Sequence, residues 1–395
     1  MIPIFLYIFR TGGRRFPGKC LPGRLRRLSG KGVKALFGLE ERILDTKRDM
    51  EAREALLASR NLAVPGGESL VLGFFRDDRL VATGALVGNI LQGIAVAGEI
   101  EGEGAAAAVT SALLKRAVER GMRKVFLYSK PQEARIFREL GFSLLAEVVV
   151  ERSGLGAALM EWGAEGIEDW KAGMAKFAEG KPRGAGAAVV NCNPFTLGHR
   201  KLLEHAAERS PWLYVLVVEE DRSLFPFDAR LRLVREGISD LENVTVLPGG
   251  PYVISSATFP SYFTRVPAGG DSRKITELYA ALDLEMFRRH VAPALGVGIR
   301  FVGTEPYCPV TSVYNDLMKR ILPAGGEGIP PVEVREIPRF ERDGSPVSAS
   351  RVRDLIREGR PGEAAALVLK TTAQWLESEE AAPVLERIRT SGSRH

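Results

Sequence analysis

The sequence predicts an α/β protein with a mixed α/β domain followed by a doubly wound, Rossmann-like parallel-sheet domain. A length of 395 residues gives room for two or three domains, each with a sizeable core. Contents of 45% hydrophobic and 26% charged residues are typical of an ordinary globular protein. From residue 185 onward, short apolar runs alternate with helical stretches, and this alternation favours a parallel sheet with helices on both faces.

The positive charge is confined to the start of the chain. The formal net charge is +6, but residues 1–39 hold nine Lys or Arg and no acid, so the remainder sums to −3. We therefore expect no nucleic-acid partner. The apolar stretch 1–9 is too short to span a bilayer, and its charges follow it, unlike those of a secretory signal. We expect a disordered basic arm over 1–39, no membrane association and a cytoplasmic location.

The three cysteines predict neither a zinc site nor a disulfide framework. Cys20, Cys192 and Cys308 lie far apart and form no C-x-x-C pair. Cys192 and Cys308 fall in candidate loops, where each could be a nucleophile or simply a small loop residue. We favour the second interpretation.

Residues 40–150 are expected to form the mixed domain. The pattern predicts strands within 69–96, a glycine loop and helix over 101–122, a strand at 124–130, a helix at 133–142 and a closing strand at 144–152. The strands within 69–96 are expected to turn at Asp77–Asp78 and near Gly88–Asn89. Residues 151–184, rich in Gly and Ala, are expected to be a linker with one helix.

This order, with an F-x-x-x-G-F turn from Phe137 to Phe142, resembles the GNAT acetyltransferase fold. That resemblance implies an acetyl-CoA pyrophosphate loop of the form [RQ]-x-x-G-x-[GA], which corresponds to residues 101–106 here. Glu101 and Glu103 place two carboxylates where a pyrophosphate would bind. Because like charges at contact distance repel, we expect this loop to oppose acetyl-CoA binding.

The stretch 185–209, AGAAVVNCNPFTLGHRKLLEHAAER, is expected to carry the chemistry. Residues 187–190 predict a buried strand, Pro194 and Gly198 break the backbone, and helical spacing begins at His199. A loop that opens at a helix N-terminus favours a bound phosphate, because free amides and the positive end of the helix dipole meet there. The loop matches neither the Walker pattern nor G-x-G-x-x-G.

T-L-G-H in this stretch resembles the H-x-G-H signature of nucleotidylyltransferases, with Thr196 in place of the first histidine. The longer form N-C-N-P-F-T-x-G-H resembles the citrate lyase ligase branch. Further matching stretches are 255–263, 302–315 and VSASRVR at 347–353, so the resemblance covers about residues 40 to 377. Citrate lyase ligases carry a similar N-terminal domain.

The remaining strands of the parallel sheet are expected at 212–221, 243–248, 298–303 and 332–338, with helices at 225–241, 283–296 and 309–322. The first of these helices carries three arginines, Arg230, Arg232 and Arg235. Either they form a solvated face of the helix, or one of them reaches a phosphate. Gly303 and Glu305 follow a strand, so they should face the same crevice as His199, since ligands bind at the carboxyl ends of strands in open sheets.

A second phosphate motif is expected near the C-terminal end of this domain. Ser350 is predicted to cap a helix from Arg351 to Glu358, with Arg353 one turn inside it. This segment resembles the I-S-T-S-x-x-R motif of nucleotidylyltransferases, with Ser348 and Ser350 at matching places. The expected ATP-binding domain spans 185–360, and 361–395 forms a helix and tail.

The resemblance implies a ligase that activates acetate with ATP as acetyl-adenylate, releases pyrophosphate, and acetylates the thiol of the citrate lyase acyl carrier subunit. The thiol belongs to a CoA-derived prosthetic group, which we expect to dock near 259–263. Mg²⁺ is expected with the triphosphate, although no acidic cage of metal ligands is visible.

Among the residues of the two motifs, we expect His199 to stabilise the α-phosphoryl oxygens and the amides of Gly198 and His199 to hold the α/β bridge. Arg353, Ser348 and Ser350 are expected to bind the β- and γ-phosphates, and Thr196 to supply a hydroxyl. The remaining expected nucleotide-binding residues belong to the first loop and are Asn193, Pro194 and Phe195.

Two alternatives stay open. A conventional nucleotidylyltransferase would join a nucleotide to a phosphorylated acceptor such as a pantetheine phosphate and would not respond to acetate. A non-catalytic module would bind CoA or the carrier with both sites silent.

Overall fold

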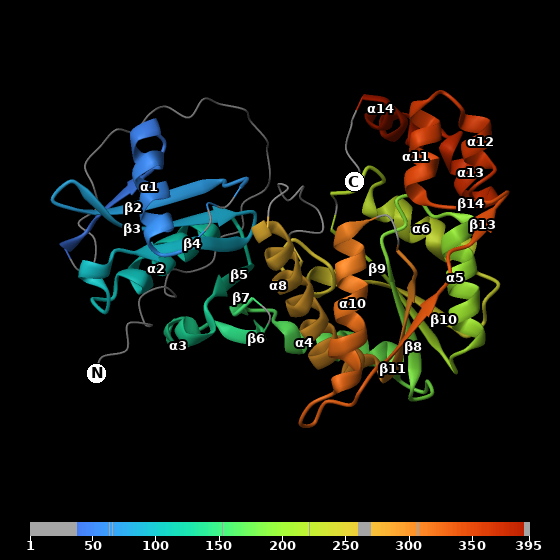
Figure 1. Ribbon diagram of the computed structural model, residues 1–395, viewed down its shortest axis with the longest axis horizontal. Coiled ribbons are helices and arrows are strands. Elements are labelled where there is room, and N and C mark those ends of the chain that lie inside the picture. The colour runs from blue at the N-terminus through green and yellow to red at the C-terminus, as the bar shows by residue number, and fades with distance from the viewer. Residues whose placement is uncertain are drawn as a thin grey trace, which may run out of the picture.

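The computed structural model describes residues 38–390, apart from positions 63, 65, 152, 221, 260–269 and 306–307. Two α/β domains lie next to each other, and helix α8 stands between them (Figure 1). The basic arm expected over 1–39 lies outside the described residues except for its last two positions. In the described part of the chain, every helix is too short or too polar to cross a membrane.

The N-terminal domain is built on a seven-stranded mixed sheet of order β1-β2-β3-β4-β5-β7-β6. Its neighbouring strands are antiparallel except for β4 and β5, which run parallel. In chain order the elements are β1 (Glu40–Ile43), α1 (Lys47–Ser59), β2 (Leu70–Arg76), β3 (Arg79–Val87), β4 (Ile90–Val96), α2 (Ala105–Glu119), β5 (Lys124–Ser129), α3 (Ala134–Glu139), β6 (Ser143–Val150) and β7 (Leu155–Gly163). This domain confirms the predicted mixed α/β class.

Both turns expected within 69–96 are present. Asp77 and Asp78 join β2 to β3 with φ angles of 50° and 59°. Short polar side chains tolerate this left-handed backbone, which matches the twist of a two-residue hairpin. Gly88 and Asn89 form the two-residue turn from β3 to β4, in which Gly88 has a positive φ of 58° and Asn89 does not.

The interpretation of 151–184 as a linker is wrong for its first half. Residues 155–163 form β7, which lies between β5 and β6 and pairs with both. The strand is hard to recognise because its buried centre contains small residues, Ala157 and Ala158, beside Leu159 and Met160. Strand β6 is therefore the edge of the sheet, and the chain closes the domain with β7. The single helix expected in this stretch is present as α4 (Ile167–Ala178).

The C-terminal domain contains a five-stranded sheet of order β10-β9-β8-β11-β12, with every pair parallel. Its elements are β8 (Ala185–Val190), α5 (Leu197–Glu208), β9 (Leu213–Val217), α6 (Phe227–Gly237), β10 (Val244–Pro248), α8 (Gly270–Met286), a π-helical turn (Phe287–Val291), α9 (Ala292–Leu295), β11 (Val297–Gly303), α10 (Pro309–Ala324), β12 (Glu333–Ile337), β13 (Glu341–Arg342), β14 (Ser345–Pro346) and α11 (Ala349–Arg357). The predicted doubly wound sheet is confirmed.

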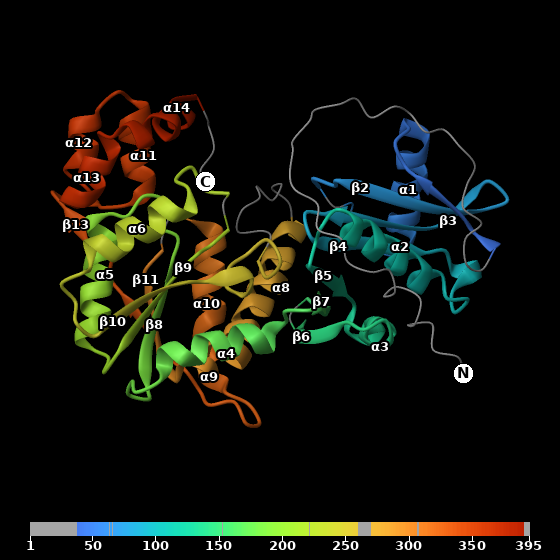
Figure 2. The ribbon, with the colours of Figure 1, turned by 180° about the vertical axis from the view of Figure 1, so that it is seen from behind.

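Helices cover both faces of this sheet because alternate strand residues point to opposite sides. Val215 and Val217 pack with α5, α6 and α11, whereas Tyr214 and Leu216 pack with α4, α8, α9 and α10. Figure 2 shows α4 and α9 lying across one face, with α5 on the other side of the strands.

Two helix predictions differ from the structure. The helix expected at 283–296 is the end of a longer unit, because α8 begins at Gly270 and continues through the π-helical turn into α9. The single helix expected in 361–395 is instead three short ones, α12 (Pro361–Ala365), α13 (Lys370–Leu376) and α14 (Ala382–Thr390). They pack through Trp375, Val384 and Ile388 onto the core around α6 and α11.

Helix α8 belongs to both domains. Leu282 and Met286 lie in a buried cluster with Phe126 of β5 and Leu159 of β7, on the face of the N-terminal sheet that α2 does not cover. Leu284, two residues from each of them, faces the core of the parallel sheet. One helix therefore fills the space between the two sheets.

A substitution at Leu282, whose side chain is fully buried, tests this shared core. Leu282→Ala should lower the free energy of unfolding by about 2–5 kcal/mol, because the cavity opens between the two sheets. Val118→Ala, on the exposed side of α2, is the control and should change it by less than about 0.5 kcal/mol. Urea unfolding of both variants gives the comparison, and equal small effects would contradict a shared core.

Candidate active site

The two predicted phosphate motifs meet at the carboxyl edge of the parallel sheet. The loop 191–196 follows β8, and α5 begins at Leu197 with Thr196 as its N-cap. The second motif precedes α11, whose N-cap is Ser348. A Cβ atom on Gly198 would lie 2.5 Å from the carbonyl oxygen of Val347, so only glycine lets the two backbones approach this closely. The missing side chain of Gly198 therefore admits the backbone of the second motif.

Arg353 adds a second link between the motifs. Its Nη1 donates to the carbonyl oxygen of Asn193, and its Nη2 lies 3.3 Å from the Ser350 hydroxyl. The side chain is buried. Arg353 therefore holds the backbone of the first loop and places a positive charge next to it.

The hydrogen bonds of His199 fix which ring nitrogen carries the proton. Its Nδ1 lies 3.1 Å from the backbone nitrogen of Thr196 and 2.9 Å from the Thr196 hydroxyl. A backbone N–H can only donate, so Nδ1 is the acceptor and the proton of the neutral ring sits on Nε2. The ring also stacks on Phe195, with centroids 6.0 Å apart. His199 thus offers an oriented Nε2–H donor.

The surroundings of His199 keep its imidazole neutral. Burial, with the positive charges of Arg339 and Arg353, lowers its pKa from 6.5 to about 4. Both effects disfavour the charged ring. At neutral pH the site therefore presents a neutral donor that is influenced by two guanidinium groups.

Thr196 does not face a ligand as the sequence analysis expected. Its side chain is fully buried, and its hydroxyl accepts a hydrogen bond from the His199 amide at 3.4 Å while contacting Nδ1 of the same residue. Thr196 is thus a helix cap that orients the imidazole.

One first-turn amide of α5 remains available for a phosphate oxygen. The Leu197 amide donates to the carbonyl oxygen of Leu367, and the His199 amide is capped by Thr196. Within the described part of the chain, the Gly198 amide donates no hydrogen bond. The expected pair of binding amides is therefore reduced to one.

The side chains of the other predicted loop residues point into the protein interior. Asn193 and Pro194 are buried, and Phe195 is completely enclosed. The Asn193 side chain accepts a hydrogen bond from the Phe225 amide at 3.0 Å, and Phe195 packs against Gly237. These side chains shape the loop rather than line a crevice.

Arg230 also holds the loop and does not reach out for a phosphate. It is fully buried, and its guanidinium donates to the carbonyl oxygens of Asn191 at 3.1 Å and of Val218 at 2.6 Å. These carbonyls lie just beyond the ends of β8 and β9. Among the other two arginines of α6, Arg232 pairs with Glu380 at 2.6 Å and Arg235 lies elsewhere, beside a groove.

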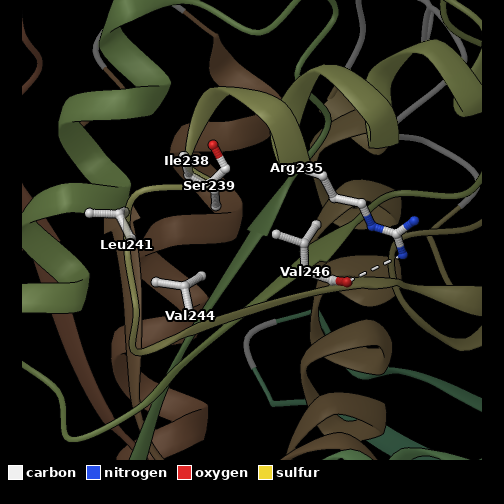
Figure 3. A pocket seen from close by; sticks show the side chains of 6 residues that line it. All are labelled: Arg235, Ile238, Ser239, Leu241, Val244 and Val246. Atoms are coloured by element: carbon white, nitrogen blue, oxygen red, sulfur yellow. Dashed lines mark hydrogen bonds between the residues drawn. The ribbon is translucent and has the colours of Figure 1, made fainter.

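That groove is separate from the site. Its volume is about 220 Å³, and it lies between the end of α6 and β10 (Figure 3). Its lining residues are Arg235, Ile238, Ser239, Leu241, Val244 and Val246. None of them belongs to either phosphate motif.

Arg339 is a site residue that the sequence analysis missed. It follows β12, and its Nε donates to the carbonyl oxygen of Thr304 at 2.8 Å. Its Nη2 donates to Glu305, which also accepts from the Cys308 amide at 3.0 Å. Glu305 therefore reaches the crevice edge as expected, but as the partner of Arg339 and the start of α10. Arg339 could have been found by the rule that located Glu305, because it too directly follows a parallel strand.

Gly303 ends β11 as predicted, and a Cβ there would meet nothing within 4 Å.

The expected cap of the second motif is shifted by two residues. Ser348, not Ser350, accepts from the Arg351 amide at 3.1 Å, and α11 begins at Ala349. Ser350 lies inside the first turn beside Arg353. The shift arises because a helix start is set by the cap that reaches an N3 amide, and both serines fit that pattern in sequence.

Cys192 shows no sign of a catalytic role. Cys192 is buried with a positive φ of 51°, and burial raises its pKa well above the ordinary range. A thiol held protonated in this way is a poor nucleophile.

Within the described ranges, no three His, Cys, Asp or Glu side chains gather as ligands for a metal ion.

The acidic loop of the N-terminal domain is less repulsive than expected. Glu101 pairs with Arg60 at 2.7 Å, and Glu103 pairs with Arg76 at 2.6 Å. Arginines distant in sequence thus offset part of the negative charge on which the expectation of weak acetyl-CoA binding rests.

The fold and site together define a two-domain α/β protein with an anion-binding geometry at the carboxyl edge of its parallel sheet. Residues 185–376 match the family model described as the citrate lyase ligase C-terminal domain. A [citrate [pro-3S]-lyase] ligase of Klebsiella pneumoniae is 39% identical over 334 residues, which cover 85% of this chain and 94% of that protein. The corresponding ligase of Escherichia coli strain K12 is 38% identical, over 82% of this chain and 88% of that protein. The chain belongs to the citrate lyase ligase family, as its motifs predicted.

Solved structures similar to part of this chain carry acyltransferase names. An acyl-CoA N-acyltransferase from Pseudomonas aeruginosa is 17% identical with a TM-score of 0.28, over 32% of this chain and 99% of that one. A GCN5-related N-acetyltransferase from Kribbella flavida is 19% identical with a TM-score of 0.23, over 28% of this chain and 34% of that one.

The close approach of Gly198 to Val347 can be tested by a substitution that adds a methyl side chain at position 198. Gly198→Ala should lower the free energy of unfolding by about 1–3 kcal/mol, because the new Cβ forces the two motifs apart. Gly173→Ala in α4 is the matched control: nothing lies within 4 Å of its Cβ, so helix propensity should raise stability by about 0.5–1 kcal/mol. Urea unfolding measures both, and a neutral Gly198→Ala would show that the motifs can separate freely.

The neutral state of His199 predicts an unusual titration. In the free protein its ring should titrate with a midpoint near pH 4 by NMR, where only four histidines need assignment. The Arg339→Gln variant should titrate at a higher pH, because one repelling charge is gone. Since the pKa falls on folding, His199 should make the protein less stable as the pH drops from about 6.5 toward 4. A midpoint near 6.5 would contradict the described surroundings of the ring.

Proposed function

We propose that the carboxyl edge of the parallel sheet is where this ligase activates acetate with ATP. The acetate oxygen attacks the α-phosphorus, the bond from this phosphorus to the bridging oxygen breaks, and pyrophosphate leaves. The resulting acetyl-adenylate then acetylates the prosthetic-group thiol of the citrate lyase acyl carrier subunit, giving AMP and releasing the thiol proton. Membership of the citrate lyase ligase family supports this reaction.

The observation that carries the proposal is the oriented Nε2–H of His199, whose ring also feels the positive charges of Arg339 and Arg353. Charge grows on the α-phosphoryl oxygens during in-line attack, and a fixed neutral donor there stabilises it without having to reorganise. Because the His199 ring is neutral, it does not attract the acetate carboxylate by charge, so acetate does not compete with the α-phosphate for this donor. Thr196 keeps Nδ1 engaged, so it acts as a positioning residue.

We assign the remaining contacts to the phosphates. The Gly198 amide would bind an oxygen at the α/β bridge, at the positive end of α5. Arg353 and the hydroxyls of Ser348 and Ser350 would bind the departing pyrophosphate, and Arg339 would add charge on the opposite side. The proposed nucleotide-binding domain is 185–360, with 361–395 as helices attached to it.

Mg²⁺ would enter with the triphosphate. The described residues do not form an acidic cage, and Mg²⁺ commonly keeps most of its ligands as water and phosphate oxygens. The cytoplasmic location and the docking site of the carrier stay predictions of the sequence analysis, and residues 260–263 of the expected docking loop lie outside the described residues.

Pyrophosphate–ATP exchange without lyase tests the proposal directly. We expect exchange that depends on acetate and falls at least about 100-fold in His199→Ala, because a donor to the developing charge is lost. His205→Ala, on the last turn of the same helix, is the matched control and should retain exchange.

Two results would redirect the proposal. Exchange driven by a phosphorylated acceptor, and not by acetate, would make the protein a conventional nucleotidylyltransferase. Absence of exchange even with deacetylated lyase, together with undetectable ATP binding, would indicate a non-catalytic module.

A further inference from the structure

The loop 249–259 connects the candidate active site to the N-terminal domain. It leaves β10 at the carboxyl edge of the parallel sheet and is largely buried. Neither phosphate motif contains it, and the family resemblance leaves its role open. Its described contacts divide into two sets, one to each domain.

The first set reaches across from the N-terminal sheet. Tyr128, on β5, donates its hydroxyl hydrogen to the carbonyl oxygen of Ala257, and its ring contacts Tyr279 of α8 edge to face with centroids 5.3 Å apart. Burial raises the pKa of Tyr128 well above its usual value, so the hydroxyl remains a donor. Tyr128 therefore holds the backbone of the loop from the other domain.

A second contact of the same kind lies at Tyr252, near the start of the loop. Its hydroxyl donates to Glu161 of β7 at 2.5 Å and accepts from Lys124 of β5 at 2.7 Å. Glu161 and Tyr252 are both buried. Hydrogen bonds of this kind between charged and polar groups, shielded from water, are stronger than those at the surface.

The other set of contacts leads toward the phosphate loop. The Ser256 amide, adjacent to Ala257, donates to the carboxylate of Glu220 at 2.6 Å. The carbonyl oxygen of Glu220 accepts from Arg230 at 3.1 Å, and Arg230 donates to the Asn191 side chain at 2.9 Å. Asn191 begins the loop that ends at the Thr196 cap. A continuous series of hydrogen bonds thus joins Ala257 to the first motif.

We propose that the N-terminal domain serves acetate activation as a rigid support for loop 249–259, with Tyr128 as the positioning residue. This proposal rests on the proposed function. Two domains joined only by a flexible connection could not fix a backbone carbonyl of one from a side chain of the other. Here α8, packed against both sheets, holds Tyr128 and Ala257 at hydrogen-bond distance. A series of contacts does not by itself prove energetic coupling, so the coupling must be measured.

The test is Tyr128→Phe in the full chain, which removes one hydroxyl and keeps the ring against Tyr279. We expect kcat for acetate-dependent exchange to fall about tenfold while KM for ATP changes less than about twofold, since one hydrogen bond that aligns the loop is lost. Amide hydrogen exchange over 249–259 should become faster. Tyr214→Phe is the matched control, because the Tyr214 hydroxyl meets the Phe177 carbonyl oxygen at 3.4 Å, away from this loop.

A double substitution separates positioning from general stability. If Tyr128 and Glu220 act through the same loop, Tyr128→Phe combined with Glu220→Ala should reduce kcat by less than the product of the single effects. Multiplicative effects would overturn the proposal. So would an activity loss in Tyr128→Phe that matches its unfolded fraction, or normal kcat together with faster amide exchange in the loop.

Pyrophosphate exchange by the unaltered protein, combined with amide hydrogen exchange in the loop, distinguishes failure of this proposal from failure of the proposed function. If the unaltered protein shows no acetate-dependent exchange of pyrophosphate, the proposed function fails, and the positioning role in acetate activation falls with it. If the unaltered protein is active but Tyr128→Phe leaves both kcat and loop protection unchanged, only the positioning role is overturned.

Discussion

The close approach of Gly198 to the carbonyl oxygen of Val347 determines the geometry of the site. It brings together two helix N-termini that lie about 150 residues apart in sequence, and Arg353 secures them by donating to the Asn193 carbonyl oxygen. Burial of His199, together with the positive charges of Arg339 and Arg353, lowers the pKa of the imidazole. The ring is therefore neutral, and the Thr196 cap fixes its orientation.

Several arginines at this edge bind backbone carbonyls, and only some of their charge faces outward. Arg230 is enclosed and satisfies the carbonyl oxygens where β8 and β9 end. Carbonyl groups at the ends of parallel strands need hydrogen-bond donors once they are buried. A guanidinium supplies several donors in a fixed plane and so can hold two loops at once. Arg353 and Arg339 place further positive charge at the edge where we propose that the triphosphate binds.

The two domains are integrated through α8, which contributes side chains to both cores. The N-terminal sheet offers α8 the face that its own helices leave uncovered. Loop 249–259 lies in this contact region and carries hydrogen bonds from both sides. The arrangement brings side chains of the N-terminal domain into direct contact with a loop at the carboxyl edge of the parallel sheet.

The sequence by itself determined the fold class, the five parallel strands and the two motifs, because strand alternation, breakers and caps are local signals. It also placed His199 and Glu305 at one edge, since the ends of parallel strands meet there. It could not identify β7 or the ion pairs of Glu101 and Glu103. Arg339 was missed although the rule that located Glu305 applies to it as well. Likewise, it assigned Thr196 and Phe195 to a ligand although both are buried. Which groups face inward, and which distant charges meet, depends on packing between segments far apart in the chain, and only the tertiary structure decided these points.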